Sequence, residues 1–162
     1  MTSSHLNELL TIIEHLRGDR HKLALVLGDF GAGKTRLLQE AARAAGGVYL
    51  NLNLALSERL LTRPRSDYKN GVAVPQMIDE LCDEAAPGSR PLFVDNVELL
   101  FSPDLGKINP VDTFSRVARQ RVVVLALPAR RQGAEAEYSH TGRADHLRMH
   151  LGAFPVVELK AS

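Results

Sequence analysis

The stretch that decides the fold runs from Leu23 to Thr35 and reads Leu-Ala-Leu-Val-Leu-Gly-Asp-Phe-Gly-Ala-Gly-Lys-Thr. Five consecutive apolar residues, 23 to 27, are typical of a strand that is buried on both faces of a sheet. The next eight residues match the pattern G-x-x-x-x-G-K-T, and a helical stretch follows from Arg36 to Ala45. A strand, a glycine-rich loop and a helix in this order predict a phosphate-binding loop, the P-loop of residues 28–35.

The residue types in the P-loop suit the binding of a polyphosphate. Glycines let backbone N–H groups approach phosphate oxygens, and the following helix adds the positive end of its dipole. Lys34 supplies a positive charge for the β- and γ-phosphates, and the Thr35 hydroxyl can ligate Mg²⁺. We therefore expect ATP and Mg²⁺ as ligands, with these residues around the nucleotide: Gly28, Asp29, Phe30, Gly31, Ala32, Gly33, Lys34, Thr35 and Arg36.

A second apolar segment ends in an acid. Leu92-Phe93-Val94 precedes Asp95, and this is the Walker B pattern that follows a P-loop further along the chain. Such an aspartate holds Mg²⁺ through water, opposite the P-loop hydroxyl. We expect Asp95 and Thr35 to form the magnesium site together.

The remaining periodicity predicts a single α/β domain over residues 1–162. Helices are expected at Ser4–Arg17, at Pro75–Ala86 and from Asn109 onward, and further strands at Val48–Leu54, Val122–Leu127 and Phe154–Leu159. Alternating strands and helices indicate a three-layer fold with a mostly parallel five-stranded sheet and helices on both faces. Residues 1–22 should form an N-terminal helix packed on the core. The polar segment 133–150 is expected to be partly helical.

A whole strand–helix unit separates the two motifs, and this order resembles the additional-strand class of P-loop ATPases, which includes AAA+ and RecA-like proteins. In that class a glutamate usually follows the Walker B acid and activates water, but here the position holds Asn96. An amide cannot accept a proton, so general-base help of roughly 10²–10⁴-fold would be absent. Glu98 is the substitute candidate, because a helical turn after Asp95 would return it to the same face.

The same resemblance suggests roles for four arginines. Arg130 or Arg131, after the strand that ends at Leu127, would read the γ-phosphate. Arg143 and Arg148 lie where an AAA+ chain has the arginine finger that acts on a neighbouring subunit. The chain ends soon after the last expected strand, so the helical C-terminal lid of AAA+ proteins is expected to be absent.

Composition limits the class of protein. The chain has 162 residues, a net charge of +1 and one cysteine, Cys82. A single cysteine argues against a disulfide framework and fits a reducing cytoplasm. The N-terminus has no secretory pattern, and no apolar run approaches the roughly 20 residues of a membrane span. We expect a cytoplasmic protein with no membrane partner.

Several segments resemble BrxF, a family of small P-loop proteins of BREX phage-defence systems. The matching segments are Asn51-Leu52-Asn53-Leu54-Ala55-Leu56-Ser57 running into Leu60-Leu61, then Leu92-Phe93-Val94-Asp95-Asn96-Val97-Glu98-Leu99-Leu100-Phe101, and more loosely Tyr138-Ser139 with Gly142. The resemblance implies ATP binding in a bacterial cytoplasm beside larger defence proteins: an ATPase, a methyltransferase and a phosphatase-like protein.

Three functions stay open from the residues. The first is a nucleotide-dependent switch or assembly factor, with weak or partner-dependent hydrolysis and a homo-oligomer or larger defence proteins as partners. The second is a small P-loop phosphotransferase. The third is a DNA-associated adaptor that uses ATP only for binding or assembly, with a basic face formed by Arg63, Arg65, Lys69, Arg116, Arg119 and Arg121.

Overall fold

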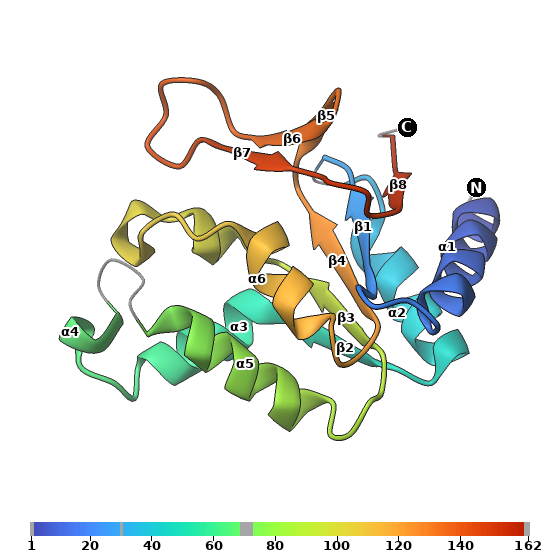
Figure 1. Cartoon of the computed structure of the whole chain (residues 1–162). Helices are drawn as coiled ribbons and strands as arrows, with labels where there is room; N and C mark the ends of the chain where they lie inside the picture. Colours follow the sequence, from blue (N-terminus) through green and yellow to red (C-terminus); the bar gives the residue numbers. More distant parts are fainter. Residues whose placement is uncertain (1, 30, 69–72, 161–162) are drawn as a thin grey trace.

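A five-stranded parallel sheet forms the centre of the molecule (Figure 1). The structure is a computed structural model that describes residues 2–29, 31–68 and 73–160. The strands, in the order in which they lie in the sheet, are β2 (Val48–Asn51), β3 (Leu92–Asp95), β4 (Val123–Leu127), β1 (Leu23–Leu27) and β8 (Val156–Glu158). Every neighbouring pair in this sheet is parallel. The predicted α/β class is confirmed.

Helices cover both faces of the sheet (Figure 1). Alternate residues of β1 enter different hydrophobic clusters, because side chains of a strand alternate between its faces. Ala24 and Val26 pack toward α1 (Thr2–Leu16) and α2 (Lys34–Ala45), whereas Leu25 packs toward α3 (Leu52–Leu60), α5 (Val74–Ala85) and α6 (Pro110–Val117). The result is the three-layer arrangement that the sequence predicted. In the part of the chain that the structure describes, no helix has the length and apolarity needed to cross a bilayer.

The strand order separates the two motif strands. β4 lies between β1, which leads into the P-loop, and β3, which ends in Asp95. The contact between the two motifs is instead made by α2, which begins at Lys34 and packs against β3 as well as β2. Short elements complete the main body: α4 (Arg65–Tyr68) and the 3₁₀ helices η2 (Glu98–Phe101) and η3 (Pro103–Leu105). The N-terminal helix α1 packs against α2, β1 and β8.

The second strand is shorter than the sequence suggested. It was expected to run to Leu54, but β2 ends at Asn51 and α3 begins at Leu52. The side chain of Asn51 accepts a hydrogen bond from the backbone N–H of Leu54 at 3.1 Å. Asparagine is a strong helix N-cap, and this local bond favours a helix start over continued strand pairing.

The expectation of partial helix in residues 133–150 is wrong. The segment belongs to a three-stranded antiparallel sheet of β5 (Arg130–Gln132), β6 (Glu135–Tyr138) and β7 (Leu147–His150), above the main sheet in Figure 1. Ala136 of β6 and Met149 of β7 pair in register and are buried in the main core, while their strand neighbours are more exposed. Burial of alternate residues explains why this polar segment forms strands.

Arg121 does not belong to the basic face that was expected to bind DNA. Arg121 is only 5% exposed, and its guanidinium donates to the carbonyl of Ala86, at the end of α5, and to Asp83 Oδ1 at 2.9 Å. Arg121 therefore stabilises the end of a helix and is not available to phosphates of DNA. Of the others, Arg63 and Arg65 form ion pairs with acids at 3.7 and 3.8 Å, and Lys69 lies outside the described residues.

Gly47, where the chain enters β2, allows a close approach to β3. A Cβ atom at this position would lie 2.6 Å from both the Phe93 ring and the Pro91 carbonyl oxygen. We expect Gly47→Ala to lower the free energy of unfolding by about 1–3 kcal/mol, because the overlap forces the two strands apart. Gly18→Ala is the matched control, since no atom lies within 4 Å of its added Cβ. Urea unfolding of both variants tests this expectation, and equal midpoints would contradict it.

Candidate functional site

The P-loop backbone has a conformation that requires glycine at two positions. Gly31 and Gly33 have φ angles of 80° and 96°, in the left-handed region that side chains with a Cβ rarely adopt. Gly33 is also the N-cap of α2, so the loop turns directly into the helix. Phe30, one of the predicted nucleotide-binding residues, lies outside the described residues. The first turn of α2 then presents Lys34 and Thr35 at the end of the loop.

Lys34 lies inside the curve of the loop. Its side chain is only 9% exposed, and its Nζ donates to the carbonyl oxygens of Gly28 at 2.7 Å and Asp29 at 2.8 Å. Burial lowers the pKa of Lys34, while the charges of Asp95, Glu98 and Asp29 act in the opposite direction. An anion bound beside this amine would favour the ammonium form further.

Asp95 is the most connected acid of the site. Its carboxylate is 3% exposed and receives three hydrogen bonds. Oδ2 accepts from the Thr35 hydroxyl at 2.6 Å and from the Tyr49 hydroxyl at 2.8 Å, and Oδ1 accepts from the backbone N–H of Asn96 at 2.9 Å. The predicted pairing of Thr35 with Asp95 is therefore present in the structure, and Tyr49 is a residue that the sequence reasoning missed.

Tyr49 is a neutral donor in this cluster. Burial raises the pKa of its phenol to about 12, and the hydrogen bond to Asp95 acts in the same direction. The sequence contained one signal for this residue: a single tyrosine in an otherwise aliphatic and amide strand, Val48 to Asn51. Its meaning depends on the register of β2 against β3, which the sequence alone does not specify.

Eight of the sixteen predicted site residues line one cavity of about 400 Å³. It is lined by Gly31, Gly33, Lys34, Thr35, Arg36, Gln39, Asp95, Asn96 and Glu98. Gly28 and Asp29 do not line it, but their carbonyl oxygens accept hydrogen bonds from Lys34, which does. This single cavity is thus lined by residues from the P-loop, α2, the end of β3 and η2. Gln39 also lines it and was not predicted.

Glu98 faces this cavity from the start of η2. The predicted helical turn directly after Asp95 is wrong, because Asn96 has a left-handed backbone and the 3₁₀ helix begins only at Glu98, yet Glu98 still lines the cavity with Asp95. Its Oε2 accepts a hydrogen bond from Asn53 Nδ2 at 2.7 Å, and Asn53 Oδ1 accepts from the backbone N–H of Leu99 at 2.9 Å. Asn53 was not expected at the site. It holds the carboxylate of Glu98 in a defined orientation, next to Asn96, whose φ of 57° is left-handed.

The donor set fits a hard divalent cation that also binds a phosphate. Thr35 and Asp95 offer a hydroxyl and a carboxylate, the oxygen ligands that Mg²⁺ prefers. Within the described ranges, no group of three or more His, Cys, Asp or Glu side chains could hold a metal ion. A metal at Thr35 and Asp95 would therefore take its other ligands from water and from a bound anion, as Mg²⁺ commonly does.

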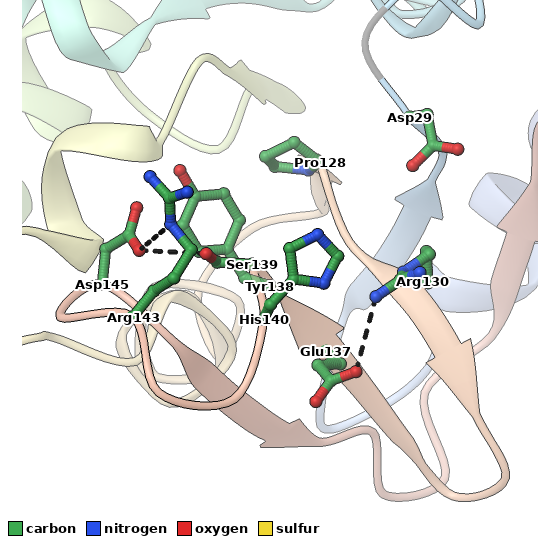
Figure 2. Close-up of a pocket in the computed structure, with 9 residues that line it drawn as sticks. All are labelled: Asp29, Pro128, Arg130, Glu137, Tyr138, Ser139, His140, Arg143 and Asp145. Atoms are coloured by element: carbon green, nitrogen blue, oxygen red, sulfur yellow. Dashed lines mark hydrogen bonds and ion pairs between the residues drawn. The ribbon is translucent and has the colours of Figure 1, made fainter.

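The four predicted arginines lie outside this cavity. Arg130 and Arg143 line a neighbouring pocket of about 390 Å³, shown in Figure 2, where Asp29 and Pro128 face the loop between β6 and β7. Arg130 forms an ion pair with Glu137 at 3.6 Å, and Arg143 pairs with Asp145 at 3.7 Å. Arg148 also pairs with Glu137, at 3.5 Å, and Arg131 pairs with Glu158 at 3.6 Å.

Each of these arginines thus has an acidic partner on or beside the small sheet, and none of the four lines the P-loop cavity.

Comparison with known proteins adds no relative. A scan against protein-family models found no match, and a search of curated proteins found none either. What the chain binds must therefore be inferred from the geometry of its own residues.

Proposed function

We propose that the chain binds ATP together with Mg²⁺ in the P-loop cavity. The observation that supports this most directly is the 2.6 Å hydrogen bond between Thr35 and Asp95, which are 60 residues apart in sequence. The two predicted magnesium ligands meet at the wall of the cavity that also contains Lys34. A chance glycine-rich turn would not bring an acid from a distant strand to this hydroxyl.

The residues divide the work of binding by their chemistry. Lys34 and the backbone N–H groups at the start of α2 would bind phosphate oxygens, while Thr35 and Asp95 would hold the metal. Mg²⁺, when bound, offsets the negative charge of the phosphates. Asp95 presents an oriented carboxylate, because three hydrogen bonds fix its position.

Hydrolysis is proposed to be slow and to use Glu98 as the base. Asn96 can orient water but has no group that accepts its proton, whereas the carboxylate of Glu98 lines the same cavity. One of its oxygens is already engaged by Asn53 Nδ2. The other oxygen is the candidate acceptor of the proton.

We further propose that the bound nucleotide acts as a switch within a BREX-like antiviral assembly. The assembly is proposed from the resemblance to BrxF, and the switch is proposed from the position of η2 between the cavity and the small sheet. Glu98 begins this short helix, and Phe101 at its end stacks on Tyr138 of β6, with ring centroids 3.9 Å apart. A shift of Glu98 on nucleotide binding would therefore be transmitted to the small sheet and to any partner that contacts it.

Replacing Lys34 tests nucleotide binding. We expect Lys34→Ala to weaken ATP binding at least 10–100-fold in calorimetric titrations with Mg²⁺, because a charged donor to phosphate is lost. Lys22→Ala is the matched control, since Lys22 precedes β1 at the end of the strand opposite the P-loop. Equal affinities of wild type and Lys34→Ala would reject the P-loop as the site.

Replacing Glu98 tests the assignment of the base. We expect Glu98→Gln to lower the steady-state rate of ATP turnover by about 10²-fold or more and to leave ATP affinity nearly unchanged, because the amide keeps the shape but cannot accept a proton. Glu14→Gln, on the exposed side of α1, serves as the control. Turnover that is equal in wild type and Glu98→Gln would exclude this role.

The switch predicts a partner that distinguishes nucleotide states. We expect the affinity of a neighbouring defence protein, such as the methyltransferase, to depend on the bound nucleotide. Its dissociation constants for the chain loaded with a non-hydrolysable ATP analogue and for the chain loaded with ADP should differ at least tenfold. A population shift requires such a difference in affinity. Interferometry with the immobilised partner measures both states, and Lys34→Ala should abolish the difference. Equal affinities in wild type would argue for constitutive assembly instead.

A further inference from the structure

Tyr49 and Thr35 both donate a hydrogen bond to Oδ2 of Asp95, but they come from different elements, β2 and α2. In the parallel pair of β2 and β3, Tyr49 is in register with Phe93, and Asn51 with Asp95. Residues paired in register share a face of the sheet, as do residues two apart on one strand. Tyr49, Phe93 and Asp95 therefore share the face covered by α2, and the Tyr49 ring packs against the cluster beneath that helix.

The length of the tyrosine side chain makes this contact possible. Tyr49 and Asp95 are diagonal neighbours on adjacent strands, and a long aromatic side chain can reach across such a separation. The Tyr49 hydroxyl lies 2.8 Å from Asp95 Oδ2, within the range of a good hydrogen bond. Phenylalanine at this position would fill the same space but would leave Oδ2 with one donor fewer.

The three donors use the acceptor positions of the carboxylate unequally. Each carboxylate oxygen has two lone pairs. Thr35 and Tyr49 occupy both positions of Oδ2, whereas the backbone N–H of Asn96 occupies one position of Oδ1. These hydrogen bonds hold the carboxylate in one orientation, and Asp95 lines the P-loop cavity.

We propose that Tyr49 is a positioning residue that holds Asp95 in the orientation in which it contributes to metal binding. The inference rests on the proposed ATP and Mg²⁺ site and assigns to Tyr49 an effect on metal affinity but not on the nucleotide itself. Without the phenol hydroxyl, Thr35 is the remaining side-chain donor to Oδ2 among the described residues, and the orientation of the carboxylate is less restricted. Partners that orient metal-binding carboxylates typically contribute 10–100-fold to metal affinity.

The test is Tyr49→Phe, with the metal titrated at fixed, saturating ADP. We expect the Mn²⁺ concentration at half saturation, followed by electron paramagnetic resonance, to rise 10–100-fold. Nucleotide affinity in EDTA and the urea midpoint of unfolding should change little, since the ring still packs. Thr11→Val is the control, because it removes a hydroxyl whose hydrogen bond to the Asn7 carbonyl lies within α1, away from the cavity.

A double-mutant cycle separates positioning from a general structural effect. In an Asp95→Ala background, Tyr49→Phe should add no further loss of metal affinity, because its target is gone. Unchanged metal affinity in Tyr49→Phe, or the same loss in both backgrounds, would overturn this inference while leaving ATP binding by the wild type intact. A wild type that binds neither ADP nor ATP with metal would overturn the proposed function and this inference with it.

Discussion

The hydrogen bond from Thr35 to Asp95 joins the first turn of α2 to the end of β3. It connects the P-loop that follows β1 to β3, although β4 lies between β1 and β3 in the sheet. A buried carboxylate is costly unless hydrogen bonds replace its lost water. Asp95 meets this requirement with donors from three different segments: α2, β2 and the residue that follows β3. Hydrogen bonds to a charged group contribute about 1.5–3 kcal/mol each, so the same contacts that hold the acid also hold α2 over the sheet.

This requirement explains the arrangement around the cavity. α2 has to pack against β2 and β3 for Thr35 to reach Asp95, and Gly47 allows β2 to approach β3 closely enough for Tyr49 to reach it too. β4 lies between β1 and β3, and the cavity is lined by the carboxyl end of β3 together with the P-loop that follows β1. The position of the Asp95 carboxylate thus depends on the packing of β2 and α2 against β3.

Patterns that lie within one segment could be predicted from the sequence, and contacts between segments could not. The apolar run 23–27, the P-loop motif and the strand before Asp95 are local patterns, and each of these predictions is confirmed as structure. The end of β2 was missed because Asn51 favours a helix cap over the strand pattern. The small sheet was missed because its strands are short and polar, and its burial depends on Met149 and Ala136 meeting the main core. Tyr49 and Asn53 act across strands, so their roles follow from register and not from spacing in the chain.

The distribution of charge around the cavity explains why the orientation of Asp95 matters for the proposed function. A nucleoside triphosphate has several negative charges, and Lys34 is the buried cation of the cavity that would meet them in the proposed complex. Arg36 also lines the cavity, but it is largely exposed and paired with Glu40 at 3.0 Å, so water and its partner weaken its attraction to an anion. Arg130 and Arg143 are paired with acids in the adjacent pocket. Neutralisation of the phosphates would therefore depend largely on a metal ion, and the affinity for that ion would depend on a carboxylate oriented by Thr35, Tyr49 and the backbone of Asn96. On this reasoning the hydroxyl of Tyr49 affects nucleotide binding only when metal is present, which distinguishes its role from that of Lys34.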